Sequence, residues 1–123
     1  MNDAPRKIPP SDFRKFKKEV LRQIDRLGLK DWDVDFKFDD LSPDAQEAKI
    51  EMNYKIRKAS FFYSTRLLGD RLHSGIGPIV AAKHEVAHLL VFELACIGAS
   101  RFITDDEIRI AEEKLVTILS KVL

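Results

Sequence analysis

The chain has 123 residues, of which 45% are hydrophobic and 33% charged, a composition typical of a folded globular protein rather than a disordered one. This length suits one core, and we expect a flexible arm over residues 1–10 and a single domain over residues 11–123. The apolar stretches are too short to cross a membrane, and the first residues lack the apolar core of a secretory leader. The single Cys96 cannot form an internal disulfide, so we expect a cytoplasmic protein.

The net charge of +1 conceals an uneven distribution along the chain. Residues 1–30 carry nine Lys and Arg against four Asp and Glu, whereas residues 31–51 carry two against eight. The basic segment could contact nucleic acid, with Lys15, Lys17 and Lys18 as the contacts. A solvated helix face is the favoured interpretation, because the helix also carries acidic residues and lacks a known DNA-binding pattern, and nucleic-acid contact is the alternative.

Periodicity predicts a first helix followed by three strands. Apolar residues recur at helical spacing after the expected N-cap Ser11, and Gly28 is the expected terminator. These apolar residues are Phe13, Phe16, Val20, Ile24 and Leu27. Alternation of apolar and polar residues predicts strands in "WDVDFKF" and "KIEMNYKI", and the short aromatic "ASFFYS" predicts a third. Short connections favour antiparallel pairing, so we expect a mostly antiparallel sheet.

Two further helices are predicted after the glycine-rich loop at residues 69–77. Pro78 fits the first turn of a helix that runs to about Gly98. Because its apolar residues lie nearly all round, we expect this helix to be buried at the centre of the fold. Thr104 is the expected N-cap of the last helix, with Glu107 three residues further on.

The central helix contains "HEVAH", in which His84 and His88 lie four residues apart with Glu85 between them. Residues four apart are neighbours on one helix face, so both imidazoles can bind one metal ion. Glu85 lies about 100° round the helix from His84, where it can act on a water molecule instead of on the metal. This division of roles is what a zinc hydrolase requires. Apolar neighbours on the histidine face lead us to expect that this face is buried.

A catalytic zinc site normally has a third protein ligand. The last helix offers Glu112, which falls within its apolar stripe, and a carboxylate in such a place needs a positive partner. Glu112 is therefore the expected third ligand. Glu113, one step round the same helix, and His73, in the preceding loop, are the alternatives. Cys96 is better explained as a structural thiol.

With these elements in place, the chain resembles the zincin metallopeptidases, and more narrowly the small SprT-like and phage-encoded minimal zincins. The matching segments are "WDV", "NYKIRKASFFY", "VAAKHEVAHLL" and "AEEKLV", the last of which resembles the gluzincin helix that supplies the third ligand. The resemblance implies a minimal α+β zincin: an N-terminal helix, a three-stranded mostly antiparallel sheet, a buried HExxH helix and a C-terminal helix. It also implies zinc-dependent hydrolysis of peptide bonds, with Glu85 as general base and the strand at 59–64 as the sheet edge that an extended peptide joins.

Two other functions remain open alongside the metallopeptidase. One is a non-catalytic peptide-binding module on a degenerate zincin scaffold. The other is a regulator that associates with nucleic acid through the basic first helix. Four protein ligands on the zinc would favour the former, and salt-sensitive retention on DNA would favour the latter.

Overall fold

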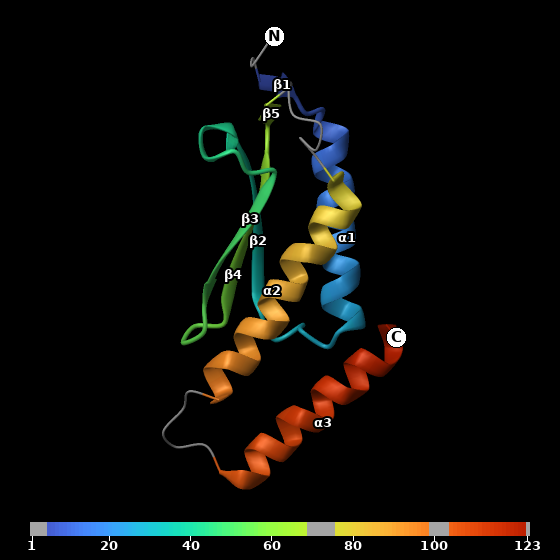
Figure 1. Cartoon of the computed structure of the whole chain (residues 1–123), viewed down its shortest axis with the longest axis vertical. Helices are drawn as coiled ribbons and strands as arrows, with labels where there is room; N and C mark the ends of the chain where they lie inside the picture. The colour runs from blue at the N-terminus through green and yellow to red at the C-terminus, as the bar shows by residue number, and fades with distance from the viewer. Residues whose placement is uncertain (1–4, 69–75, 99–103, 123) are drawn as a thin grey trace. The chain divides into compact units, whose positions relative to one another are not determined.

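The computed structural model describes residues 5–68, 76–98 and 104–122. The chain forms two compact units, Met1–Leu89 and Leu90–Leu123. The elements follow in the order β1, α1, β2, η1, β3, β4, β5, α2 and α3 (Figure 1). Three helices and small sheets confirm the α+β class. Within the described ranges, no helix combines the length and apolar character that a membrane span requires.

Helix α1 (Pro10–Arg26) begins slightly before the expected position. Pro9 is the N-cap in place of Ser11, and Pro10 occupies the first turn, where its missing N–H costs nothing. The helix ends in a Schellman motif at Gly28, whose φ of 70° is readily adopted by glycine. The Gly28 N–H bonds to the Asp25 carbonyl at 3.3 Å, and the Leu29 N–H bonds to the Ile24 carbonyl at 2.9 Å. The predicted terminator is confirmed.

The apolar face of α1 packs on the sheet of the first unit. Phe16 is fully buried and stacks on Tyr63 of strand β4, with ring centroids 4.8 Å apart. Phe13 stacks in the same way on Phe38 of strand β2, with centroids 4.7 Å apart. The predicted apolar positions of this helix therefore do form the contact with the sheet.

The main sheet has the order β2–β4–β3, with β2 at Asp33–Asp39, β3 at Ala48–Asn53 and β4 at Lys58–Ser64. Strand β4 runs parallel to β2 and antiparallel to β3. The expectation of a mostly antiparallel sheet was wrong, and so was the placement of residues 59–64 at the edge. The tight β3–β4 turn enforces antiparallel pairing, whereas the longer β2–β3 connection leaves room for β4 between them.

Burial explains why β4 takes the centre. Phe61 and Tyr63 are buried on the side that faces α1, and Phe62 is buried on the opposite side. Lys37 and Lys49 cover the Phe62 ring from the neighbouring strands, with their Nζ atoms 5.4 and 4.6 Å from its centroid. A strand with buried aromatic residues on both sides is most stable where both of its neighbours shield it.

A second, two-stranded sheet joins β1 (Pro5–Lys7) to β5 (Arg66–Leu68) in antiparallel register. The Ile8 N–H also bonds to the Thr65 carbonyl at 2.8 Å. Part of the segment that we expected to be a flexible arm is therefore paired. Residues 1–4 of that segment lie outside the described residues.

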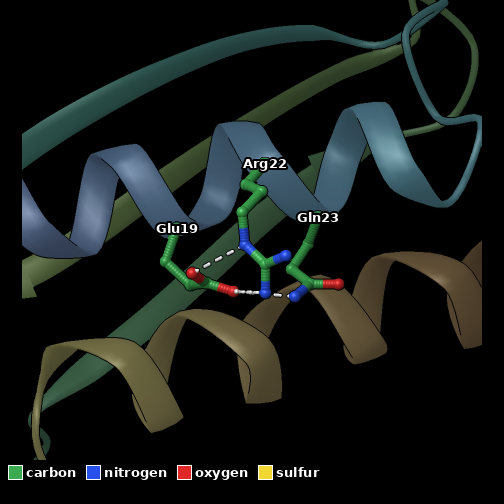
Figure 2. A network of polar contacts seen from close by, with 3 residues as sticks. All are labelled: Glu19, Arg22 and Gln23. Carbon is green, nitrogen blue, oxygen red and sulfur yellow. Dashed lines mark hydrogen bonds and ion pairs between the residues drawn. The ribbon is translucent and has the colours of Figure 1, made fainter. Parts of the chain in front are cut away.

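A buried carboxylate lies on the side of α1 that is turned toward α2 (Pro78–Gly98) (Figure 2). Glu19 is only 7% exposed, and its two oxygens accept hydrogen bonds from the Arg22 guanidinium at 3.1 and 3.0 Å. The Gln23 side-chain amide donates a third at 2.7 Å. The Arg22 hydrogen bond, the Gln23 bond and the nearby charge of Lys83 lower the Glu19 pKa, although burial opposes them.

Glu19→Gln should therefore lower the free energy of unfolding at neutral pH by about 1 kcal/mol, a value reduced because Arg22 is largely exposed. A lowered pKa in the folded state means that ionised Glu19 stabilises the fold above its unfolded pKa. This stabilisation is lost as the pH falls through the folded pKa. Urea unfolding at pH 7 and at acid pH should show the parent and variant converging in acid. Glu51→Gln, at an exposed position of β3, is the control, and a pH-independent difference for Glu19→Gln would contradict the assignment.

Candidate metal centre

Helix α2 has the predicted limits, but only one side of it is buried. Gly77, with φ of 88°, precedes it, and the Ala81 N–H bonds to the Gly77 carbonyl at 3.0 Å. In the first unit the buried side of α2 consists of Ala81, Ala82, Glu85, Val86 and Leu89. A helix turns about 100° per residue, so these positions share one face. The expectation that the whole helix is buried was wrong.

His84 and His88 lie on the other, exposed side of α2. Val80 and Val91, which we expected to bury this face, are themselves 52% and 63% exposed. The prediction of a buried histidine face is therefore corrected. Ala81 and Ala82 are buried on the side of the helix that faces the rest of the first unit, and the imidazoles are consequently directed outward.

The two imidazoles are nevertheless close together. Their Nε2 atoms lie 3.1 Å apart, and their ring centroids are 4.7 Å apart with the planes at 86°. Two nitrogens that each lie about 2.0–2.1 Å from one tetrahedral zinc ion are themselves separated by about 3.3 Å. The pair therefore fits two positions on a single metal ion. Without a metal, the same geometry permits a hydrogen bond if one ring donates and the other accepts.

Glu85 lies between the histidines in sequence but on the buried side of the helix, where it is 7% exposed. Burial raises the pKa of its carboxyl group above the ordinary value for glutamate. The charges of His84 and His88 act in the opposite direction, and the charge of Glu47 raises the pKa further. Glu85 is thus electrostatically coupled to both histidines and to a second carboxylate.

Sequence reasoning missed that second carboxylate, Glu47. One of its oxygens accepts a hydrogen bond from the Tyr63 hydroxyl at 2.8 Å, and the other accepts one from the Ile76 N–H at 2.8 Å. Burial and the bond to Glu47 raise the pKa of Tyr63, so its hydroxyl is a stable donor. No spacing along the chain relates Glu47 to the HExxH motif, because it lies 38 residues before Glu85.

Glu47 and Tyr63 also line a cavity of about 400 Å³ in the first unit, together with Asp12, Lys7 and Leu67 among others. Its size is sufficient for a small molecule or a side chain. The described lining residues include none of the residues at 84–88. The cavity is therefore distinct from the exposed histidine pair.

Helix α3 (Asp105–Val122) begins as predicted, and the Glu107 N–H bonds to the Thr104 hydroxyl at 3.1 Å. Its sides differ from the prediction. Ile118 is buried and Ala111 and Leu115 are half-buried, whereas Ile108 and both candidate ligands, Glu112 and Glu113, are exposed. Glu112 therefore does not lie within a buried apolar stripe, because the buried side is rotated away from it.

The second unit has an ion pair between a buried carboxylate and an exposed ammonium group. Glu93 of α2 is 6% exposed, and its carboxylate lies 3.7 Å from the Lys114 ammonium of α3. Leu90 and Leu94 of α2 line a small cavity together with Ala111 and Leu115 of α3. The residues at 111, 114 and 115 therefore define the side of α3 that meets α2 within this unit, which explains the rotation.

Among the described residues, no group of three or more His, Cys, Asp or Glu side chains is arranged to hold a metal ion. His73 lies outside the described residues. Cys96 is a half-buried free thiol. Glu112 as third ligand therefore stays a prediction.

Searches against protein-family models, curated proteins and solved structures found no match to this chain.

Proposed function

We propose that the chain is a zinc-dependent metallopeptidase of the minimal zincin type. His84 and His88 would hold the metal, and Glu85 would act as general base. The observation that carries the proposal is the 3.1 Å separation of the two Nε2 atoms, which matches two ligands of one zinc ion. The i, i+4 spacing on a rigid helix maintains that separation without any other part of the fold.

A bound zinc ion would lower the pKa of a water molecule and polarise the scissile carbonyl group. Glu85 would accept the proton of the attacking water at a carboxylate oxygen and deliver it to the leaving amine nitrogen. Its attachment between the two histidines keeps its carboxylate within their electrostatic reach. An unfolded peptide is the substrate class that this reaction requires.

The test is direct. Protein purified without added metal should contain about one zinc per chain by elemental analysis, and should cleave an unstructured protein in a reaction that a chelator stops and zinc restores. Protein that acquires zinc but cleaves none of a broad set of unfolded substrates would instead support a non-catalytic binding module.

Glu112 is our proposed third ligand, and Glu113 is its matched control on the next position of α3. Glu112→Ala should weaken zinc binding by about 10-fold or more. Loss of a residue that hydrogen-bonds to a metal ligand already lowers metal affinity by about that factor, and loss of a ligand should lower it at least as much. Glu113→Ala should leave affinity unchanged. Both side chains are exposed, so neither change should unfold the protein. Competition titration against a zinc-sensitive dye measures both affinities, and the reverse pattern would transfer the role to Glu113.

A further inference from the structure

The outward side of α1 carries a cluster of positive charge, which we call the basic face and define as Arg14, Lys15 and Lys18. At 100° per residue these three positions fall within one 100° arc of the helix, opposite the buried Phe16 and Val20. All three are exposed. In the part of the chain that the structure describes, none of them forms an ion pair with an acidic side chain.

Two nearby cations do not belong to this face. Lys17, which the sequence suggested as a contact, places its Nζ 5.5 Å from the ring centroids of both Phe13 and Phe36. It therefore covers aromatic side chains at the edge of the core. Arg22 lies one turn beyond Lys18, but its charge is compensated by Glu19. Three uncompensated cations remain, and they are held on a helix that the core makes rigid.

The structure decides which polyanion suits this face. A helix that binds membranes inserts its apolar side into the lipid, whereas the apolar side of α1 is occupied by the sheet. In the part of the chain that the structure describes, no Phe, Tyr or Trp side chain is exposed, so this face has no ring on which an unpaired base could stack. The three cations lie within about 6 Å of rise along α1, and such a compact cluster of charge complements the closely spaced phosphates of a duplex.

We propose that the basic face binds the phosphate backbone of double-stranded nucleic acid without sequence recognition. This activity is independent of the proposed metal site, because it uses a different helix and no metal ligand. About three phosphate contacts give a slope of about −2.7 for log K against log salt, which corresponds to a loss of about 40-fold in affinity between 50 and 200 mM salt.

The experiment is fluorescence anisotropy with a labelled DNA duplex of mixed sequence, titrated with the full chain at several salt concentrations. The triple variant Arg14→Gln, Lys15→Gln, Lys18→Gln should bind at least about 10-fold more weakly at low salt and lose most of the salt dependence. The control triple Lys30→Gln, Lys55→Gln, Arg109→Gln removes the same charge from other exposed positions and should bind like the parent. The charge-preserving variant Lys15→Arg, Lys18→Arg should also bind like the parent.

Equal losses in both triple variants would show that net charge, and not the basic face, attracts the duplex, and would overturn the proposal. So would binding by the parent to vesicles of anionic lipid with none to the duplex. Chelation of metal, or His84→Ala, should leave duplex binding unchanged, so failure of the metallopeptidase proposal and failure of this one give different results.

Discussion

Replacing either His84 or His88 with alanine is expected to abolish zinc binding at stoichiometric concentrations. The two Nε2 atoms are 3.1 Å apart, so each ring supplies one of two adjacent ligand positions. Removal of one ring leaves a single imidazole on the exposed side of the helix. Loss of a residue that only hydrogen-bonds to a metal ligand lowers metal affinity by roughly 10–100-fold, and loss of a ligand itself should lower zinc affinity by more. Zinc per chain after dialysis, measured by elemental analysis, gives the result.

Because both rings are exposed, this experiment can separate loss of zinc binding from loss of the fold. Substitutions at exposed helix positions usually change the free energy of unfolding by less than about 0.5 kcal/mol, so loss of zinc would not reflect loss of fold. Val91→Ala, at a 63% exposed position on the same side of α2, is the matched control and should keep its zinc. Full zinc content in both histidine variants would eliminate the site as proposed.

Glu85→Gln is expected to reduce peptide hydrolysis by about 10²–10⁴-fold while zinc content stays unchanged. Glutamine has nearly the same shape as glutamate but cannot accept the proton of the attacking water. The substitution also removes a carboxylate that is 7% exposed, and burial disfavours the charge of that carboxylate, so the variant should fold at least as well as the parent. Cleavage of an unstructured protein at saturating zinc measures the effect.

Glu113→Gln is the control for this experiment, because it makes the same chemical change at an exposed position. Its activity should equal that of the parent. If Glu85→Gln were equally active, another group would have to be the base. If instead it lost its zinc, Glu85 would be a ligand and the assignment of roles within the motif would change.

Local signals in the sequence were sufficient for most of the helices and for the histidine pair. Gly28 ends α1 because its positive φ suits glycine, and Thr104 begins α3 because its hydroxyl caps the first turn. The short distance between His84 and His88 is also determined by local structure. The geometry of one helical turn brings residues four apart together wherever the helix lies.

Only the tertiary structure decided the strand order, the like-charge repulsion between Glu47 and Glu85, and the side of each helix that is buried. Strand β4 is central because it carries buried aromatic residues on both sides, a preference that depends on what the two neighbouring strands can cover. Glu47 comes near Glu85 through the pairing of β3 with β4 and its bond to Tyr63, and such contacts between distant residues leave no periodic trace in the chain. The apolar residues of α2 lie nearly all round the helix, so the hydrophobic pattern could not identify its buried side. In α3 the pattern gave an apolar stripe, but the side that meets α2 at residues 111, 114 and 115 is rotated from that stripe. Contacts between elements decide which side of a helix is buried, and here they left the histidines and Glu112 exposed.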